Sequence, residues 1–275
     1  MARSGTSDNI RLHSFSLEIC AKNELGYEIK ITKKDSNQIS FVIFDPLRKI
    51  LLFKEENSLT NFLRLHEYQF RKILHNKRLE TFYIGFKLHF VIWENKNMLD
   101  FNNNKKIITF DNTEKEIKCY VTDRIVPDKF IYADGAFSEK TEKASCAIII
   151  KDKENSKNAK LYGEIINNAK DSNQVELLAA IKGLELASKY KVLRLHTDSR
   201  YVKKGITEWI FYWQVNDWTT ANGTKAKHIE LWKKFLNLTS GKIVQFAWIK
   251  GHSKKNPENK LCDYYAKLLL NTDDN

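Results

Sequence analysis

The sequence predicts an α/β fold for the second half of the chain, preceded by a small α+β domain. In residues 128–275, short apolar runs alternate with stretches whose apolar residues recur at helical spacing. In residues 1–121, alternating runs typical of strands flank one helical stretch. The two parts meet near residues 122–128, where an alternating run ends and Pro127 precedes the next apolar run. We therefore expect two domains, over residues 1–121 and 128–275.

The first domain begins with four expected strands, at Leu12–Cys20, Tyr27–Lys33, Ile39–Phe44 and Lys49–Phe53. A helix is expected over residues 57–76, and its inner stripe would contain Phe62, Leu65, Phe70 and Leu74. A further alternating run over residues 81–93 would place on one face Phe82, Ile84, Phe86, Leu88, Phe90 and Ile92. A hairpin tip rich in asparagine and lysine is expected at residues 102–106.

The second domain begins with three expected strands, at Ile131–Ala133, Ser145–Ile150 and Leu161–Ile166. An amphipathic helix is expected over residues 175–190, where the residues at helical spacing that should enter the core are Leu177, Ile181 and Leu184. Two later runs, Val192–Thr197 and Val244–Ile249, predict a central strand and a last strand. A final helix is expected after Pro257.

Four acidic residues stand in distinctive local frames within the second domain. Asp134 and Asp198 each follow an apolar run, so we expect both at strand ends. Glu176 falls in the first turn of the predicted helix, and Asp263 opens the final helix. An Asp-Gly pair such as Asp134-Gly135 more often marks a turn when it stands alone, so the interpretation depends on the whole set.

Acidic side chains that gather without lysine partners repel one another. At a separation of about 5 Å and an effective dielectric constant of about 20, each pair costs roughly 3 kcal/mol. A divalent cation cancels this repulsion, and hard oxygen ligands suit magnesium or manganese. Two such ions about 3.5–4 Å apart can stabilise both the attacking and the leaving oxygen of a phosphodiester displacement. The acids therefore suggest a nuclease that uses two metal ions.

Several longer motifs surround these acids in a fixed order, namely Asp134-Gly135, residues 173–180, 197–202, 205–210, 248–252 and 256–259, and Cys262-Asp263. With these motifs, residues 129–270 resemble the type 1 ribonuclease H domain, the enzyme that cuts the RNA strand of RNA–DNA hybrids. The resemblance implies a mixed five-stranded sheet flanked by helices, with an antiparallel meander before the helix that carries Glu176. It also implies cleavage that leaves 3′-hydroxyl and 5′-phosphate ends. Residues 1–121 resemble no domain known to us, including the short hybrid-binding domain that precedes many eukaryotic relatives.

The resemblance also implies roles for particular residues. Asp134, Glu176, Asp198 and Asp263 would hold two Mg²⁺ ions, for which Mn²⁺ is a substitute. A lone histidine usually has no such role, but the Lys-Gly-His frame of His252 matches a family histidine that serves the active site from a mobile loop. Proton transfer or product release would then be its function.

Substrate contacts are expected from two further segments. Ser172 or Asn173 can cap the helix that carries Glu176, and both residues could, with Gln174, reach sugar hydroxyls and minor-groove edges of a hybrid. Four tryptophans resemble the aromatic residues of the family's basic protrusion, where they could stack on deoxyribose or merely pack the protrusion, namely Trp209, Trp213, Trp218 and Trp232.

Two departures from the family pattern limit what the resemblance carries over. Residues 137–143 replace the glycine-rich loop that many bacterial relatives have after the first acid. Residues 214–217 lack the lysines that many relatives place after the second tryptophan. A basic helix face in the first domain could compensate, or it could simply be solvated, and its residues are Arg64, Arg71, Lys72, Lys77 and Arg78.

Composition agrees with an enzyme that acts on a polyanion, since the formal net charge is +12. The four cysteines are widely spaced, which excludes a zinc ribbon and favours buried, reduced thiols. No apolar run reaches the length of a membrane span, and we expect a cytoplasmic monomer with no membrane partner. A proofreading-type exonuclease is disfavoured because Ala136 stands where such sites carry glutamate. The other alternative, a non-catalytic hybrid-binding module, is disfavoured because all four acids are present.

Overall fold

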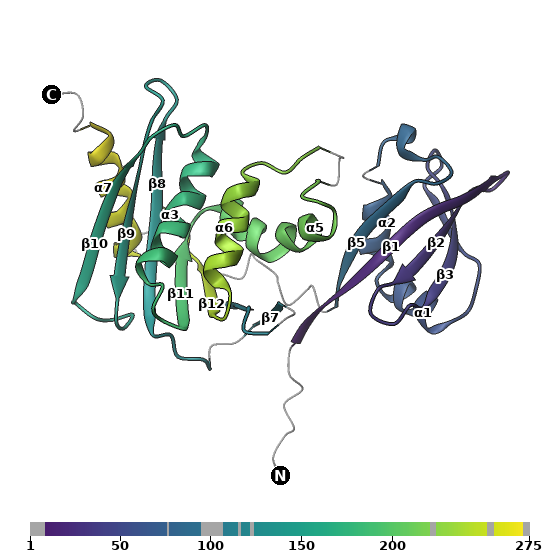
Figure 1. The fold of residues 1–275 in the computed structure, drawn as a ribbon, viewed down its shortest axis with the longest axis horizontal. Helices are drawn as coiled ribbons and strands as arrows, with labels where there is room; N and C mark the ends of the chain where they lie inside the picture. The colour runs from purple at the N-terminus through teal and green to yellow at the C-terminus, as the bar shows by residue number, and fades with distance from the viewer. Residues whose placement is uncertain are drawn as a thin grey trace, which may run out of the picture. The chain divides into compact units, whose positions relative to one another are not determined.

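The computed structural model describes residues 9–75, 77–94, 107–114, 117–121, 124–220, 224–251 and 256–271. The chain forms two compact units (Figure 1). The larger unit contains residues 1–10, 95–207 and 228–275. The smaller unit contains residues 11–94 together with residues 208–227. Among the described residues, no helix is long and apolar enough to cross a membrane.

The smaller unit contains an antiparallel sheet in the order β5-β1-β2-β3-β4. Its strands are β1 (Asn9–Asn23), β2 (Gly26–Lys33), β3 (Ile39–Asp45), β4 (Ile50–Phe53) and β5 (Lys87–Glu94). The four strands expected at the start of the chain are therefore confirmed. Two helices, α1 (Ser58–Leu65) and α2 (Glu67–His75), contribute Leu63 and Phe70 to a core that also contains Phe15 and Phe90 from the sheet.

The helix expected over residues 57–76 is instead two helices. Asn57 caps α1, because its side-chain Oδ1 accepts the N–H of Thr60 at 2.8 Å. His66 ends α1 with non-helical dihedral angles, and α2 starts directly after it. Because the two helices do not share one periodic face, Leu65 is 78% exposed and does not join the inner stripe.

The strand expected over residues 81–93 is shorter than the alternation suggests. A 3₁₀ turn occupies Leu79–Thr81, and β5 begins only at Lys87. Gly85 has a φ of +91°, which interrupts the extended backbone before the strand. Ile84 is consequently exposed, whereas Phe90 and Ile92 enter the core as expected. The hairpin tip expected at residues 102–106 lies outside the described residues.

The larger unit contains a mixed sheet in the order β10-β9-β8-β11-β12-β6-β7. Its strands are β6 (Ile108–Asp111), β7 (Lys118–Val121), β8 (Lys129–Ser138), β9 (Lys143–Lys151), β10 (Ala159–Ile166), β11 (Val192–Thr197) and β12 (Ile243–Trp248). β8, β9 and β10 form the expected antiparallel meander, and β11 runs parallel to both β8 and β12. The mixed five-stranded sheet is confirmed and is continued by two further strands.

The sheet of the larger unit crosses the expected domain boundary at residue 121. β6 pairs antiparallel with β12, and β7 pairs with β6. Residues 108–121 therefore extend the sheet of the larger unit, although they precede the expected second domain in sequence. The division falls near residue 95 because main-chain hydrogen bonds across β6 and β12 join these segments.

Helices cover both faces of this sheet (Figure 1). The larger unit contains α3 (Ser172–Leu186), α4 (Arg200–Lys204), α6 (Ile229–Thr239) and α7 (Pro257–Asn271). Leu177, Ile181 and Leu184 of α3 are buried, as expected. On the opposite face, α7 buries Cys262 and Ala266 against side chains of β8 and β9. A π-helical segment (Gly205–Trp209) and α5 (Ile210–Val215) follow α4.

Three of the four cysteines are buried, and none of the four forms a disulfide. Cys20 is the exception, because it is exposed. The register between β1 and β2 shifts between Ile19 and Ala21, and this irregularity leaves Cys20 unpaired with its side chain outside the core.

Candidate active site

Asp134 and Asp198 come together because the two strands that carry them lie side by side. β8 pairs in parallel with β11 only as far as Tyr132 and His196. Asp134 lies two residues beyond this pairing, and Asp198 follows the last residue of β11. Asp134 is not at a strand end as expected, since β8 continues to Ser138 in its hairpin with β9. The end of the parallel pairing, rather than the end of β8, places the two acids together.

The start of α3 fixes the position of Glu176. Asp171 is the cap of this helix, in place of the expected Ser172 or Asn173, because its backbone is extended and its Oδ1 accepts the N–H of Gln174 at 2.8 Å. Gln174 Oε1 in turn accepts the N–H of Lys170 at 2.7 Å. These reciprocal bonds resemble a capping box and hold the first turn of the helix, one turn before Glu176.

Gly135 allows α3 to approach β8 closely. A Cβ atom at this position would lie 2.7 Å from Cγ1 of Val175 and 3.0 Å from its carbonyl carbon. A larger residue would therefore push the helix away from the strand, and with it Glu176 away from Asp134. The Asp-Gly pair, which often marks a turn, lies here within β8 and serves this close approach.

Asp134, Glu176 and Asp198 each offer a carboxylate oxygen, and these oxygens lie within 4.8 Å of one another. Burial raises the pKa of Asp134 to about 7, and the charges of Asp198 and Asp263 add to the effect. Burial also raises the pKa of Glu176 well above its ordinary value, with further contributions from Asp134 and Asp198. Glu176 Oε2 is buried and has no hydrogen-bond partner among the described residues. Without a cation this group of acids is electrostatically unfavourable.

Asp263 lies in the second turn of α7 and outside this close group. Its carboxylate oxygen Oδ1 lies 2.6 Å from Nζ of Lys267, one helical turn later. Its charge nevertheless raises the pKa of both Asp134 and Glu176, so it lies near them. The structure thus brings three of the four predicted acids together and places the fourth beside them.

Two residues beside Asp198 had no role in the sequence analysis. Asn259 is 3% exposed, and its Nδ2 donates to Asp198 Oδ2 at 3.2 Å, while its Oδ1 is buried without a partner among the described residues. A Cβ at Gly251 would lie 2.6 Å from the same oxygen of Asp198. The signal in the sequence that could have identified Asn259 is its position on the helix that carries Asp263, one turn before that acid.

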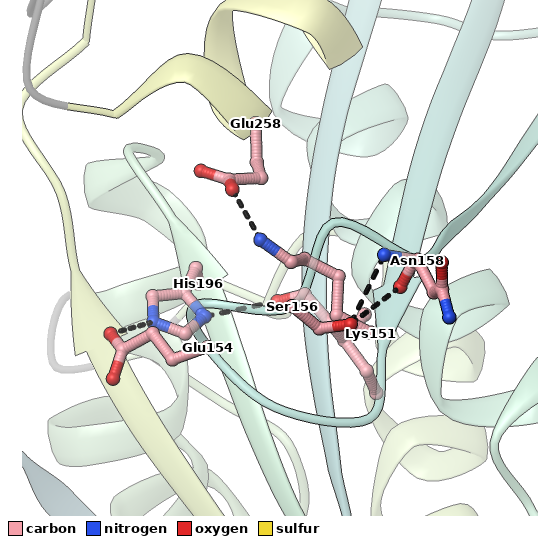
Figure 2. A network of polar contacts seen from close by, with 7 residues as sticks. Lys151, Glu154, Ser156, Asn158, His196 and Glu258 are labelled. Atoms are coloured by element: carbon pink, nitrogen blue, oxygen red, sulfur yellow. Dashed lines mark hydrogen bonds and ion pairs between the residues drawn. The ribbon is translucent and has the colours of Figure 1, made fainter.

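A partly buried ion pair anchors the start of α7 (Figure 2). Lys151 at the end of β9 has a side chain that is 6% exposed, and its Nζ lies 2.6 Å from Glu258 Oε1. Glu258 directly precedes Asn259, so the same turn of α7 is bound to β9 and to Asp198. Nearby, the buried ring of His196 stacks on Tyr132 with centroids 4.2 Å apart and lies 3.8 Å from a carboxylate oxygen of Glu154.

The residues expected to contact substrate differ in how exposed they are. Ser172 and Asn173 are exposed in the first turn of α3, whereas Gln174 is half-buried and uses its side-chain oxygen to accept a backbone N–H. Trp213 is 7% exposed and packs against Trp209, with ring centroids 5.6 Å apart. This burial agrees with a packing role for Trp213. His252 lies outside the described residues.

Comparison with known proteins gives a family for this arrangement. The RNase H family model matches residues 127–270, which is more than half of the chain and includes all four acids. The chain belongs to the RNase H family. Curated relatives named ribonuclease H include one from Methylococcus capsulatus, 36% identical over 140 residues that cover 51% of this chain and 87% of the relative.

Further ribonuclease H relatives support the same assignment. One from Bradyrhizobium diazoefficiens is 38% identical over 144 residues, which cover 52% of this chain and 89% of the relative. Among solved structures, the PFV RNase H domain aligns with a TM-score of 0.45 and 20% identity, covering 52% of this chain and 94% of that domain. The family assignment depends on the sequence matches, and the matched residues contain the strands β8–β12 and the helices α3–α6 together with α7 up to residue 270.

Asp134→Asn is expected to stabilise the metal-free ribonuclease H at neutral pH by about 1–3 kcal/mol. The pKa of Asp134 is raised in the folded protein to about 7. The folded state therefore binds more protons than the unfolded state between about pH 4 and pH 7, and stability falls as the pH rises through this range. Asparagine has no proton to lose, so the fall should be smaller in the variant.

Urea denaturation with chelator at pH 4.5 and pH 7.5 measures this difference. The two proteins should differ little at the lower pH, and added Mg²⁺ should stabilise the wild type more than the variant at the higher pH. A variant that is less stable than the wild type at pH 7.5 with chelator would show that Asp134 has a structural role.

Lys151→Met is expected to destabilise the protein by about 3 kcal/mol, because the change leaves the carboxylate of Glu258 without its partner. The double variant Lys151→Met with Glu258→Leu should recover most of this loss, since it replaces the whole buried pair by apolar side chains. The control is Lys182→Met, which removes an exposed pair with Glu164 and should cost about 1 kcal/mol or less. Equal losses for Lys151→Met and Lys182→Met would contradict a buried anchor for α7.

Proposed function

We propose that the chain is a metal-dependent endonuclease that hydrolyses the RNA strand of RNA–DNA hybrids. The observation that carries the proposal is the close group of Asp134, Glu176 and Asp198, with its buried and unpartnered Glu176 oxygen, in a member of the RNase H family. The names of the relatives support the same activity.

The side chains present fit magnesium. The group offers only carboxylate oxygens, which are the ligands that hard divalent cations prefer. We propose that Asp134, Glu176, Asp198 and Asp263 hold two Mg²⁺ ions, for which Mn²⁺ can substitute. When bound, such ions activate a water nucleophile and stabilise the leaving oxygen. They would also offset the burial and the repulsion that together raise the pKa of Asp134.

The neighbouring side chains position these acids. Asn259 donates to Asp198 Oδ2, and this bond fixes the orientation of the carboxylate. The glycine at position 251 leaves room beside the same carboxylate. Lys267 pairs with Asp263 and would compete with a cation for it. His252, which follows Gly251, would transfer a proton or assist product release.

Substrate recognition would involve the exposed start of α3. Ser172 and Asn173 project from the turn that precedes Glu176, where their polar groups could meet sugar hydroxyls. Contacts to the 2′-hydroxyl are what distinguish RNA from DNA at such a site. A hybrid-binding module without catalysis is the alternative, and the raised pKa of Asp134 argues against it because mere binding gives no reason to bury mutually repelling acids.

Asp198→Asn is expected to reduce hybrid cleavage to background, because it removes one charged ligand from the close group. Cleavage of a labelled hybrid, of double-stranded RNA and of single-stranded RNA in Mg²⁺ should be compared for the wild type and the variant. Wild-type cleavage should be confined to the hybrid and should stop in chelator. Hybrid binding without any cleavage by the wild type would favour the non-catalytic alternative.

His252→Ala is expected to slow turnover by about 10²-fold or less, because we place its role in a loop, at the lower end of the range of about 10²–10⁴ for positioned proton transfer. Single-turnover and steady-state rates should be measured together with the Mg²⁺ dependence. The cleavage pattern and the Mg²⁺ concentration at half-maximal activity should be unchanged. A large increase in the required Mg²⁺ would instead identify His252 as a metal ligand.

The basic face expected in the smaller unit is partly neutralised. Arg64 pairs with Glu56 at 2.6 Å and Arg71 with Glu67 at 2.5 Å. Burial lowers the pKa of Lys77. We therefore propose that the remaining exposed cations of this set contribute any phosphate contacts made by the smaller unit, and these are Lys72 and Arg78.

Lys72→Gln with Arg78→Gln is expected to weaken hybrid binding in the full chain. Each phosphate contact that is lost should reduce the slope of log binding constant against log salt concentration by about 0.7–0.9. The single-turnover cleavage rate at saturating enzyme should not change. The control is Lys54→Gln, whose ammonium pairs with Glu28 at 2.8 Å. Identical salt slopes for all three proteins would exclude this face as a substrate anchor.

A further inference from the structure

The smaller unit is assembled from two segments that are far apart in the sequence. Residues 208–227 lie between α4 and α6 in the sequence, yet they group with residues 11–94. By sequence, residues 208–220 form the first part of the protrusion expected to contact the hybrid, and Lys225 and Lys227 follow later in the same protrusion. We refer to residues 208–220 as the arm.

Aromatic side chains of the arm pack against residues 11–94. The ring of Phe211 meets the ring of Trp93 edge to face, with centroids 5.0 Å apart, and each residue is 4% exposed. Tyr212 packs against the apolar cluster that contains Phe15 and Phe90. Burial raises the pKa of Tyr212 to about 12. Edge-to-face contact and loss of exposed apolar area both favour this packing.

A hydrogen bond joins the arm to the edge of the sheet. Among the described strands, β5 pairs with β1 on one side. On its other side, the N–H of His89 donates to Asn216 Oδ1 at 3.1 Å. Asn216 also ends α5, since its Nδ2 donates to the carbonyl of Tyr212 at 2.9 Å. One carboxamide therefore closes the helix and satisfies a donor on an edge strand, which would otherwise be open to other chains.

The arm has little that would attract a nucleic acid. No lysine or arginine occurs from residue 210 to residue 217. The ring of Trp213 is covered by neighbours, with Trp209 and Trp218 at centroid distances of 5.6 and 6.4 Å. Binding to a nucleic-acid strand needs cations along the backbone and accessible aromatic faces. Residues 214–217, which lack the lysines found in many relatives, therefore belong to the segment that contacts β5.

We propose that the arm is an internal docking element whose partner is the β5 edge of residues 11–94, and that it is not a hybrid-binding surface. Asn216 stands among the residues that replace the family's lysines, and it supplies the bond to His89. The docking part of this inference is independent of the proposed function. The statement that hybrid does not contact the arm rests on the proposed function.

Amide hydrogen exchange of the full chain, followed by mass spectrometry without hybrid, tests the docking. Phe211→Ala with Asn216→Ala should raise the exchange rates of residues 87–94 and 208–220 by about tenfold or more, and should leave α3 unchanged. The control is Gln214→Ala, which changes an exposed residue of the same helix and should leave both segments as in the wild type. Unchanged exchange of residues 87–94 in the double variant would overturn the docking.

A milder substitution keeps the test decisive should the double variant fail to fold. Asn216→Asp retains an oxygen acceptor for the His89 N–H, whereas Asn216→Ala does not. His89 should therefore stay protected in the aspartate variant and lose protection in the alanine variant. If His89 stayed protected in both variants, Asn216 would not be what holds the strand edge.

The same exchange measurement with hybrid tests the second part, in the Asp134→Asn chain so that the substrate stays intact. Residues 170–176 should gain protection and the arm should not. New protection of the arm, with loss of protection at residues 87–94, would overturn the proposal and make the arm a substrate surface. Absence of new protection anywhere would count against the proposed function, while the docking would still be decided without hybrid.

Discussion

The repulsion among the three converging carboxylates of Asp134, Glu176 and Asp198 is the constraint on which the site depends. Asp134, Glu176 and Asp198 are held together by the parallel pairing of two strands and by the close approach of α3 at Gly135. Burial raises the pKa of Asp134 to about 7, and the charges of Asp198 and Asp263 add to this effect, so ionisation of Asp134 is unfavourable here. A fold selected for stability alone would separate such groups. The surrounding hydrogen bonds and packing must therefore supply the free energy that keeps them close until a cation binds.

The support for the site comes largely from the two helices that flank the sheet. The bond from Asp171 fixes the start of α3, one turn before Glu176. The start of α7 is bound through Glu258 to Lys151 and through Asn259 to Asp198. Buried polar pairs of this kind contribute little net stability, but they restrict the helix to one position. Such restriction matters where carboxylates must converge within a few ångströms.

The smaller unit shows how an accessory region can reuse a segment of the family fold. A surface that binds a polyanion and a surface that packs against a protein need opposite features. The first needs exposed cations, and the second needs buried aromatic groups and satisfied strand edges. Residues 210–217 have no cations and contribute Phe211 and Asn216 to the contact with β5. The chemistry of this segment therefore favours an internal partner.

The strands β1–β4 and β8–β12, the helices α3 and α7, the core positions of α3 and the frames around the four acids could be predicted from the sequence. These properties depend on periodicity and motifs within short stretches of chain. The cap at Asp171, the exposure of Leu65, the pairing of β6 with β12 and the position of residues 208–227 could not. Each depends on which of several locally acceptable arrangements is favoured by contacts with distant segments, and such contacts have no local signature. The sequence by itself determined which acidic side chains are candidates for the site, and the tertiary structure decided how close they lie and what holds them.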